Sequence, residues 1–220
     1  MGNQDRQATK DENGSASNRD GRMRLFIATP VSAEIRAILS AAVARVRARL
    51  SRNPIRWVSP DNLHLTFRFL GETPGTDVDP ITKRLRGVCG NFSPLDVQVG
   101  GLGCFPDFAE PRVIWVGLSH NSQLVKLHTA IQNATAEFGA KEASAHTTER
   151  TPPFSPHLTV GRLKDVSRPE RRRVGRELEQ QTMDKLGCWL IDRVVLMESQ
   201  LTPAGPCYEE LMSIALAARA

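Results

Sequence analysis

Two short strings, 93 positions apart, constrain this chain more than any other feature. The first is His64-Leu65-Thr66-Phe67 and the second is His157-Leu158-Thr159-Val160. Both alternate polar and apolar residues, which is typical of a half-buried β-strand. Side chains at i and i+2 of a strand lie on the same face. Each string therefore predicts a histidine and a threonine on one face and two apolar residues in a core.

The composition is that of an ordinary globular protein and carries a moderate basic bias. Of the 220 residues, 40% are hydrophobic and 24% charged, and the net charge of +5 favours anionic partners. No apolar run approaches the roughly 18 residues that span a bilayer, and the polar N-terminal segment lacks a secretory signal pattern. The four cysteines are widely spaced, without a CxxC pair. These features predict a cytoplasmic protein with reduced thiols and no membrane partner.

Residues 1–22 contain almost nothing apolar, and we expect a flexible tail there, followed by one domain over 23–220. The domain shows the order strand, helix, HLT strand, helix, strand twice. Strands are expected at 24–28, 55–58, 95–99, 112–118, 189–198 and 207–216 besides the two HLT strands, and helices at 33–50, 78–89, 123–138 and 169–186. This repetition predicts an α+β fold of two pseudo-symmetric lobes, whose antiparallel sheets flank a central cleft that carries both HxT motifs.

Two imidazoles and two hydroxyls around one cleft would suit phosphoryl transfer without a metal. Histidine titrates near neutrality, so that one ring can accept a proton while the other donates one. The hydroxyls can donate hydrogen bonds to phosphate oxygens, where charge develops. A single HLT string is more often structural, and the functional interpretation depends on the pair. His120, His128 and His146 lack a partner motif, and no spacing in the chain resembles a zinc site.

Further strings flank the two motifs along the chain. They are Arg24-Leu25-Phe26-Ile27-Ala28, Arg56-Trp57-Val58, Phe69-Leu70-Gly71, Gly101-Leu102-Gly103, Phe105-Pro106, Arg112-Val113-Ile114-Trp115-Val116-Gly117, Phe154-Ser155-Pro156, Glu198-Ser199, Gly205-Pro206 and Tyr208-Glu209. With these flanks, residues 23–217 resemble the RNA 2′,3′-cyclic phosphodiesterases, also called 2′-5′ RNA ligase-like or LigT-like proteins, of the two-histidine phosphoesterase superfamily. A departure is Ser155, where family members often carry a basic residue.

The resemblance implies a role for each motif residue. His64 would be the proton donor that protonates the departing 3′ oxygen, and His157 the proton acceptor that activates water. Thr66 and Thr159 would bind the nonbridging phosphate oxygens. The implied reaction hydrolyses a terminal 2′,3′-cyclic phosphate of RNA to a 2′-phosphomonoester, without a metal or other cofactor. The strings themselves are too alike to say which histidine is the acid.

Four other residues are candidates for RNA contacts. Strict alternation places Arg68 on the face of His64, whereas Arg162 falls on the face opposite His157 unless the strand bulges. We therefore rank Arg68 above Arg162 as a phosphate ligand. Phe154 and Tyr208 are aromatic side chains that could stack on a base, although a core role is the commoner one for each.

Other functions remain compatible with the same motifs. The chain could be a 2′-5′ RNA ligase, a phosphodiesterase for another cyclic or 2′-5′-linked nucleotide, or a non-catalytic module that binds RNA ends. Pure binding needs neither an acid nor a base, which favours an enzyme. The expected partners are RNA with 2′,3′-cyclic phosphate ends or cyclic nucleotides, and we expect a monomer.

Overall fold

The computed structural model describes residues 21–52, 54–139, 154–203 and 205–217. The predicted tail over 1–22 lies outside these ranges except for its last two residues, and the first strand begins at Arg22. The strands are β1 (Arg22–Pro30), β2 (Ile55–Trp57), β3 (His64–Pro74), β4 (Leu95–Phe105), β5 (Val113–Leu118), β6 (His157–Leu163), β7 (Gly187–Ile191), β8 (Arg193–Thr202) and β9 (Gly205–Ala215). The α-helices are α1 (Ala33–Arg49), α2 (Val78–Cys89), α3 (Ser122–Ala134) and α5 (Arg168–Glu179).

Helix α1 shows how the local sequence determines an element. The Ser32 side chain caps it by accepting a hydrogen bond from the backbone N–H of Ile35 (3.3 Å). Ile35, Leu39, Ala42 and Val46 follow at helical spacing, and all four are buried. The helix therefore starts at its cap and packs through one apolar stripe, as the sequence predicts.

Among the described residues, every helix is too short or too polar to span a bilayer.

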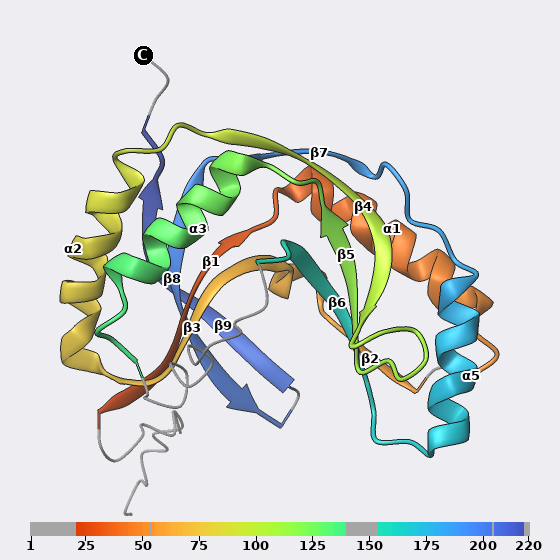
Figure 1. Ribbon diagram of the computed structural model, residues 1–220. Helices are drawn as coiled ribbons and strands as arrows, with labels where there is room; N and C mark the ends of the chain where they lie inside the picture. Colours follow the sequence, from red (N-terminus) through yellow and green to blue (C-terminus); the bar gives the residue numbers. More distant parts are fainter. Residues whose placement is uncertain (1–20, 53, 140–153, 204, 218–220) are drawn as a thin grey trace, which may run out of the picture.

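The described strands form one curled antiparallel sheet rather than two separate sheets (Figure 1). Its order is β7-β4-β5-β6-β3-β1-β8-β9, and β2 pairs with β6 beside this path. The half β3-β1-β8-β9 belongs to one lobe and the half β7-β4-β5-β6 to the other. They meet where β3 pairs with β6 through the residue pair Leu65 and Leu158. The predicted two-lobed α+β fold is confirmed, with the addition that the sheet continues through the joint.

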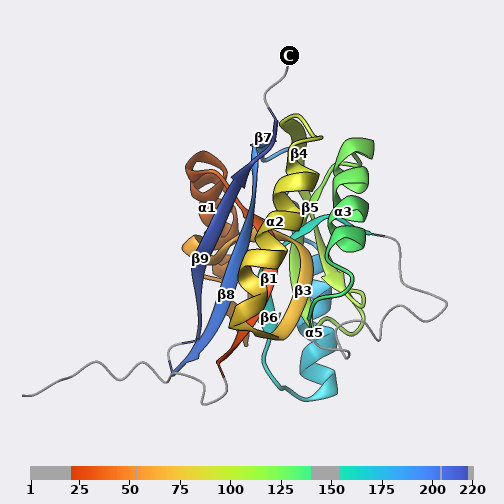
Figure 2. The ribbon, with the colours of Figure 1, turned by 90° about the vertical axis from the view of Figure 1, so that its left-hand side faces the viewer.

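The lobes are interwoven along the chain. Helices α2 and α3 lie together beside β3, β8 and β9, whereas α1 lies on β7 and α5 on β4 (Figures 1 and 2). Helix α1 follows β1 of the first lobe but covers the second, and α3 follows β5 of the second lobe but covers the first. Strands β4 and β8 also cross to the other lobe. A lobe therefore cannot be cut out as one continuous segment.

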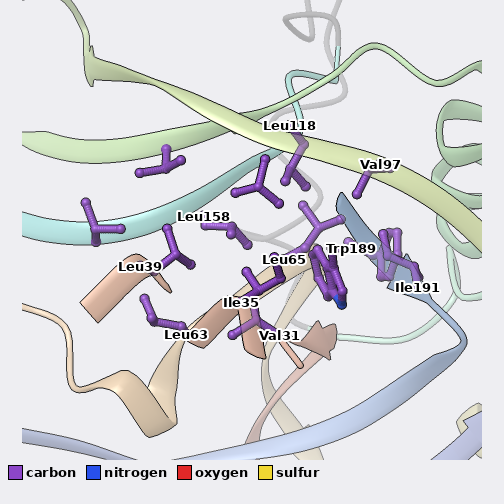
Figure 3. Packing of buried hydrophobic residues seen from close by; sticks show 14 of the residues in the cluster. Val31, Ile35, Leu39, Leu63, Leu65, Val97, Leu118, Leu158, Trp189 and Ile191 are labelled. Atoms are coloured by element: carbon purple, nitrogen blue, oxygen red, sulfur yellow. The ribbon is translucent and has the colours of Figure 1, made fainter. Parts of the chain in front are cut away.

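The joint between the lobes lies inside the main core. Leu65 and Leu158 are almost completely buried, and Figure 3 shows them among side chains of α1 and β7. Phe67 and Val160 are buried as well, as the alternation of the two motifs predicts. The apolar residues of each motif thus pack into the core on one face of the strand, and the histidine and threonine lie on the other face.

Replacing Leu158 by Ala should lower the free energy of unfolding by about 2–5 kcal/mol, because the substitution leaves a cavity at a fully buried site. Urea unfolding measures this loss. Leu201→Ala is the matched control, since Leu201 is 72% exposed and should change stability by no more than about 0.5 kcal/mol. Equal losses in the two variants would contradict the central place of the joint.

Candidate active site

The pairing of β3 with β6 brings the two motifs together. The strands are antiparallel and Leu65 lies opposite Leu158. The neighbours of this pair are then His64 beside Thr159 and Thr66 beside His157, all on the face turned away from the core. An approximate twofold axis through the leucine pair exchanges the motifs. A ligand centred on this axis meets one imidazole and one hydroxyl from each side.

Both imidazoles are held in the same way. Nδ1 of His64 lies 2.7 Å from the carbonyl oxygen of Asn62, and Nδ1 of His157 lies 2.7 Å from that of Ser155. A carbonyl oxygen only accepts hydrogen bonds, so that Nδ1 is the protonated nitrogen of each ring. Nε2 is then free in both histidines to accept a proton or, once protonated, to donate it.

Aromatic rings pack against the imidazole of each histidine. The His64 ring centroid lies 5.1 Å from that of Phe26 and 5.3 Å from that of Tyr208, which meets it edge-on. The His157 ring lies 4.9 Å from Phe105 and 6.2 Å from Trp115. Such contacts restrict the imidazole rotamers and keep Nε2 in place.

Gly103 makes room for one of these rings. A Cβ atom on residue 103 would overlap the indole of Trp115, which lies across the backbone at that point. Residue 103 pairs with Trp115 in the β4–β5 ladder, so the contact is built into the strand register. The glycine thereby lets the indole reach Phe105 and His157.

Burial lowers the pKa of both catalytic candidates, and a nearby cation lowers it further. Desolvation is the main cause for His64 and for His157, and the charge of Arg162 acts in the same direction on both. The hydrogen bond to the backbone carbonyl opposes this shift in each case. Within the described parts of the chain, no group of three or more His, Cys, Asp or Glu side chains could hold a metal ion.

A β-bulge at the fourth residue of each motif reverses the facing of the residues beyond it. In β3, Ala28 pairs with Thr66 and Ile27 with Arg68, which leaves Phe67 as the extra residue. In β6, Trp115 pairs with Thr159 and Ile114 with Gly161, which leaves Val160 as the extra residue. A bulge puts two residues opposite one and shifts the alternation by one position.

The bulges exchange the expected places of the two arginines. Arg162 comes to the histidine face, where its charge acts on both imidazoles and on Tyr208. Its side chain is exposed, and it makes no ion pair with any described residue. It is therefore available to an anion on the histidine face. The expectation that it lies on the opposite face holds only for a regular strand.

Arg68 instead turns toward α3. Its guanidinium donates hydrogen bonds to the carbonyl oxygens of Gln132 (2.8 Å) and Phe138 (3.3 Å) and to the hydroxyl of Thr135 (3.1 Å). Gln132 lies in the last turn of α3, where carbonyls lack partners within the helix, and Thr135 and Phe138 follow the end of the helix. Arg68 thus occupies a structural position and does not share the face of His64, contrary to the ranking from strict alternation.

The two aromatic candidates lie in different places. Tyr208, in β9, contacts the rings of His64 and Phe26 and is part of the site. Phe154 stacks on His128 of α3, with ring centroids 3.8 Å apart and planes 10° from parallel. Sequence reasoning missed Phe26, Phe105 and Trp115, which surround the imidazoles. Phe26 and Trp115 lie in strands that the sequence predicted, and Phe105 lies in the part of β4 beyond the predicted 95–99. None of these strands was predicted to lie beside the motifs.

Comparisons with known proteins found a matching family model, similar proteins and similar solved structures. A family model described as "LigT like Phosphoesterase" matches residues 29–115 and 119–208. An RNA 2′,3′-cyclic phosphodiesterase of Archaeoglobus fulgidus is 30% identical over 189 residues, covering 86% of this chain and 98% of that protein. One of Thermotoga maritima is 30% identical over 190 residues, covering 86% and 93%. The crystal structure of TT0787 of Thermus thermophilus is 26% identical, with a TM-score of 0.72 over 90% of this chain and 100% of that one.

Arg68→Met should destabilise the fold by about 1–3 kcal/mol, because it removes the donor to the carbonyls of Gln132 and Phe138. Its KM for a phosphodiester substrate should stay unchanged. Arg162→Met should show the reverse, with an unchanged free energy of unfolding and a raised KM. Urea unfolding and steady-state kinetics on the two variants measure both effects. A raised KM in a stably folded Arg68→Met protein would contradict the structural role of Arg68.

Proposed function

The chain belongs to the LigT-like phosphoesterase family, and on this premise we propose that it hydrolyses RNA 2′,3′-cyclic phosphates to 2′-phosphomonoesters. One observation carries the proposal: two histidines with free Nε2 atoms flank one twofold axis, each beside the threonine of the other motif. The relatives of similar length named RNA 2′,3′-cyclic phosphodiesterase support the choice of substrate.

The reaction needs an acid and a base on opposite sides of the phosphorus. In our proposal, Nε2 of His157 takes a proton from water while the water oxygen bonds to phosphorus. The bond from phosphorus to the 3′ oxygen breaks, and that oxygen receives the proton of His64 Nε2. The product keeps the phosphate on the 2′ oxygen. Each histidine ends in the state in which the other began, and proton exchange with solvent restores the enzyme.

The remaining polar groups would bind the phosphate. The hydroxyls of Thr66 and Thr159 can donate to the two nonbridging oxygens, one from each side of the axis. Arg162 adds a positive charge that has no ion partner among the described residues. These groups favour the transition state, in which negative charge on phosphate oxygens grows. They supply the charge stabilisation without a metal or other cofactor in the mechanism.

The oligomeric state and the cellular compartment of the enzyme are part of our proposal. We propose that the enzyme acts as a monomer in the cytoplasm on RNA ends or on cyclic nucleotides. All the groups named in the mechanism come from one chain, so that a second copy adds nothing the chemistry requires. The net charge of +5 suits a polyanionic substrate.

Replacing His64 or His157 by Ala should lower kcat by roughly 10²–10⁴, because each substitution removes one proton-transfer group. The assay uses an oligonucleotide with a 2′,3′-cyclic phosphate end in the presence of a chelator, and chromatography identifies the product as the 2′-phosphate. His120→Ala, at an exposed position outside the site, is the control and should keep full activity. Binding of the substrate without turnover by the unaltered protein would leave only an RNA-end binding module.

The pH profile of kcat/KM should be bell-shaped, with its maximum below pH 6.5. In the active form one imidazole is protonated at Nε2 and the other is neutral. Both pKa values are lowered from 6.5, so that this form is most abundant at lower pH. Arg162→Gln removes a charge that lowers both pKa values, and the maximum should move to higher pH. Rates measured from roughly pH 4 to 9 test this. An unmoved maximum would mean that Arg162 does not act on the histidines.

A further inference from the structure

Phe154 and His128 form a stacked pair that the mechanism proposed above does not use. Their ring centroids lie 3.8 Å apart and their planes are 10° from parallel. Phe154 precedes the second motif, whereas His128 lies on α3, the helix that covers the first lobe. The stack therefore joins the segment that leads into the motif of one lobe to a helix of the other lobe.

A side-chain amide extends this contact to the first motif. Nε2 of Gln132 donates a hydrogen bond to the backbone carbonyl oxygen of Phe67 (2.8 Å) and lies 3.2 Å from Nε2 of His128. Because a carbonyl oxygen only accepts hydrogen bonds, this amide nitrogen is a donor, and Nε2 of His128 accepts from it. The His128 ring is therefore neutral, and its burial, which lowers its pKa, favours the same form.

The backbone carbonyl that fixes the first histidine is held by a turn and by a neighbouring strand. It belongs to Asn62, the last residue of the 3₁₀ turn Pro60–Asn62, and it bonds Nδ1 of His64. The Asn62 side chain also donates to the carbonyl oxygen of Pro206 on β9 (2.9 Å). The first imidazole is thus oriented by a residue with its own local supports.

The second histidine depends on a less regular part of the chain. Its carbonyl partner is Ser155, and residues 154–156 lie outside the helices and strands. After Ser155, the N–H of Leu118 holds the segment by donating to the carbonyl oxygen of Pro156 (3.1 Å). Before Ser155, the aromatic stack on α3 holds it. The carbonyl that orients the second imidazole is therefore fixed from both sides by its neighbours in sequence.

We infer that Phe154 and His128 are positioning residues for His157, the base of the proposed reaction. The inference rests on the proposed function, because it is there that His157 takes the proton of water. The stack fixes the Ser155 carbonyl, which keeps the ring proton of His157 on Nδ1 and leaves Nε2 free. Loss of the stack frees this carbonyl, and in part of the molecules the proton then occupies Nε2, which can no longer accept one.

Nitrogen NMR of the imidazole rings tests this without substrate, at a pH where both motif histidines are neutral. Phe154→Ala and His128→Ala should each move part of the His157 population from the Nδ1-protonated to the Nε2-protonated form. His64 should keep its proton on Nδ1 in both variants, because its carbonyl partner has separate supports. The spectrum of His157→Gln identifies the signals that belong to His157.

Kinetics on a 2′,3′-cyclic phosphate give the second measurement. Both alanine variants should lower kcat roughly 10- to 100-fold, as misplacement of one reacting group does, and should leave KM unchanged. His128→Phe keeps an aromatic ring against Phe154 and should restore both the tautomer and kcat. Lys126→Ala, at an exposed position of the same helix, is the matched control and should alter neither.

Three results would overturn the inference. They are an unchanged His157 tautomer in both alanine variants, an equal change at His64, and a His128→Phe protein that behaves like His128→Ala. Absence of turnover by the unaltered protein would instead refute the proposed function, and the tautomer measurement would still test the stack. The two failures are therefore distinguishable.

Discussion

The contact between Leu65 and Leu158 is the constraint on which the rest of the structure depends. These buried side chains fix the crossing of β3 and β6, the place where the two halves of the sheet meet. Their neighbours in sequence are the histidines and threonines, so the core contact also fixes the distance between the reacting groups. Stability and catalysis therefore depend on the same pair of strands, on opposite faces. A substitution of Leu65 or Leu158 should therefore displace the imidazoles even where both lobes remain folded.

The interwoven topology strengthens this joint. Because α1 leaves β1 to cover the second lobe and α3 leaves β5 to cover the first, the lobes are connected by several chain segments as well as by the strand pair. Helix α1 contributes Ile35 and Leu39 to the core around Leu158 (Figure 3). Relative rotation of the lobes would have to break these contacts. Such an arrangement suits a reaction that needs two groups at a fixed separation, since misplacement of either one slows proton transfer.

Local sequence patterns predicted the parts of the site that obey regular alternation. His64, Thr66, His157 and Thr159 share a face because no irregularity separates the members of each pair. Past the threonines, strict alternation predicted the wrong face for both Arg68 and Arg162. A bulge is set by pairing with the neighbouring strand and leaves no mark in the motif itself. The aromatic rings around the imidazoles come from β1, β4, β5 and β9. Their positions depend on strand order, which periodicity does not encode.

The two histidines have nearly equivalent surroundings. Both histidines bond a carbonyl two residues earlier at 2.7 Å, and both have a pKa lowered by burial and by Arg162. Nothing within the motifs makes one imidazole the acid. Hydrolysis of a cyclic phosphate is nevertheless directional, because only one of the two ester oxygens departs. The substrate must then enter in one orientation, and the groups that differ across the axis have to select it. Arg162 and Phe69 occupy equivalent positions on the two motif strands, one charged and one aromatic, so the two sides of the axis differ in residues that transfer no proton.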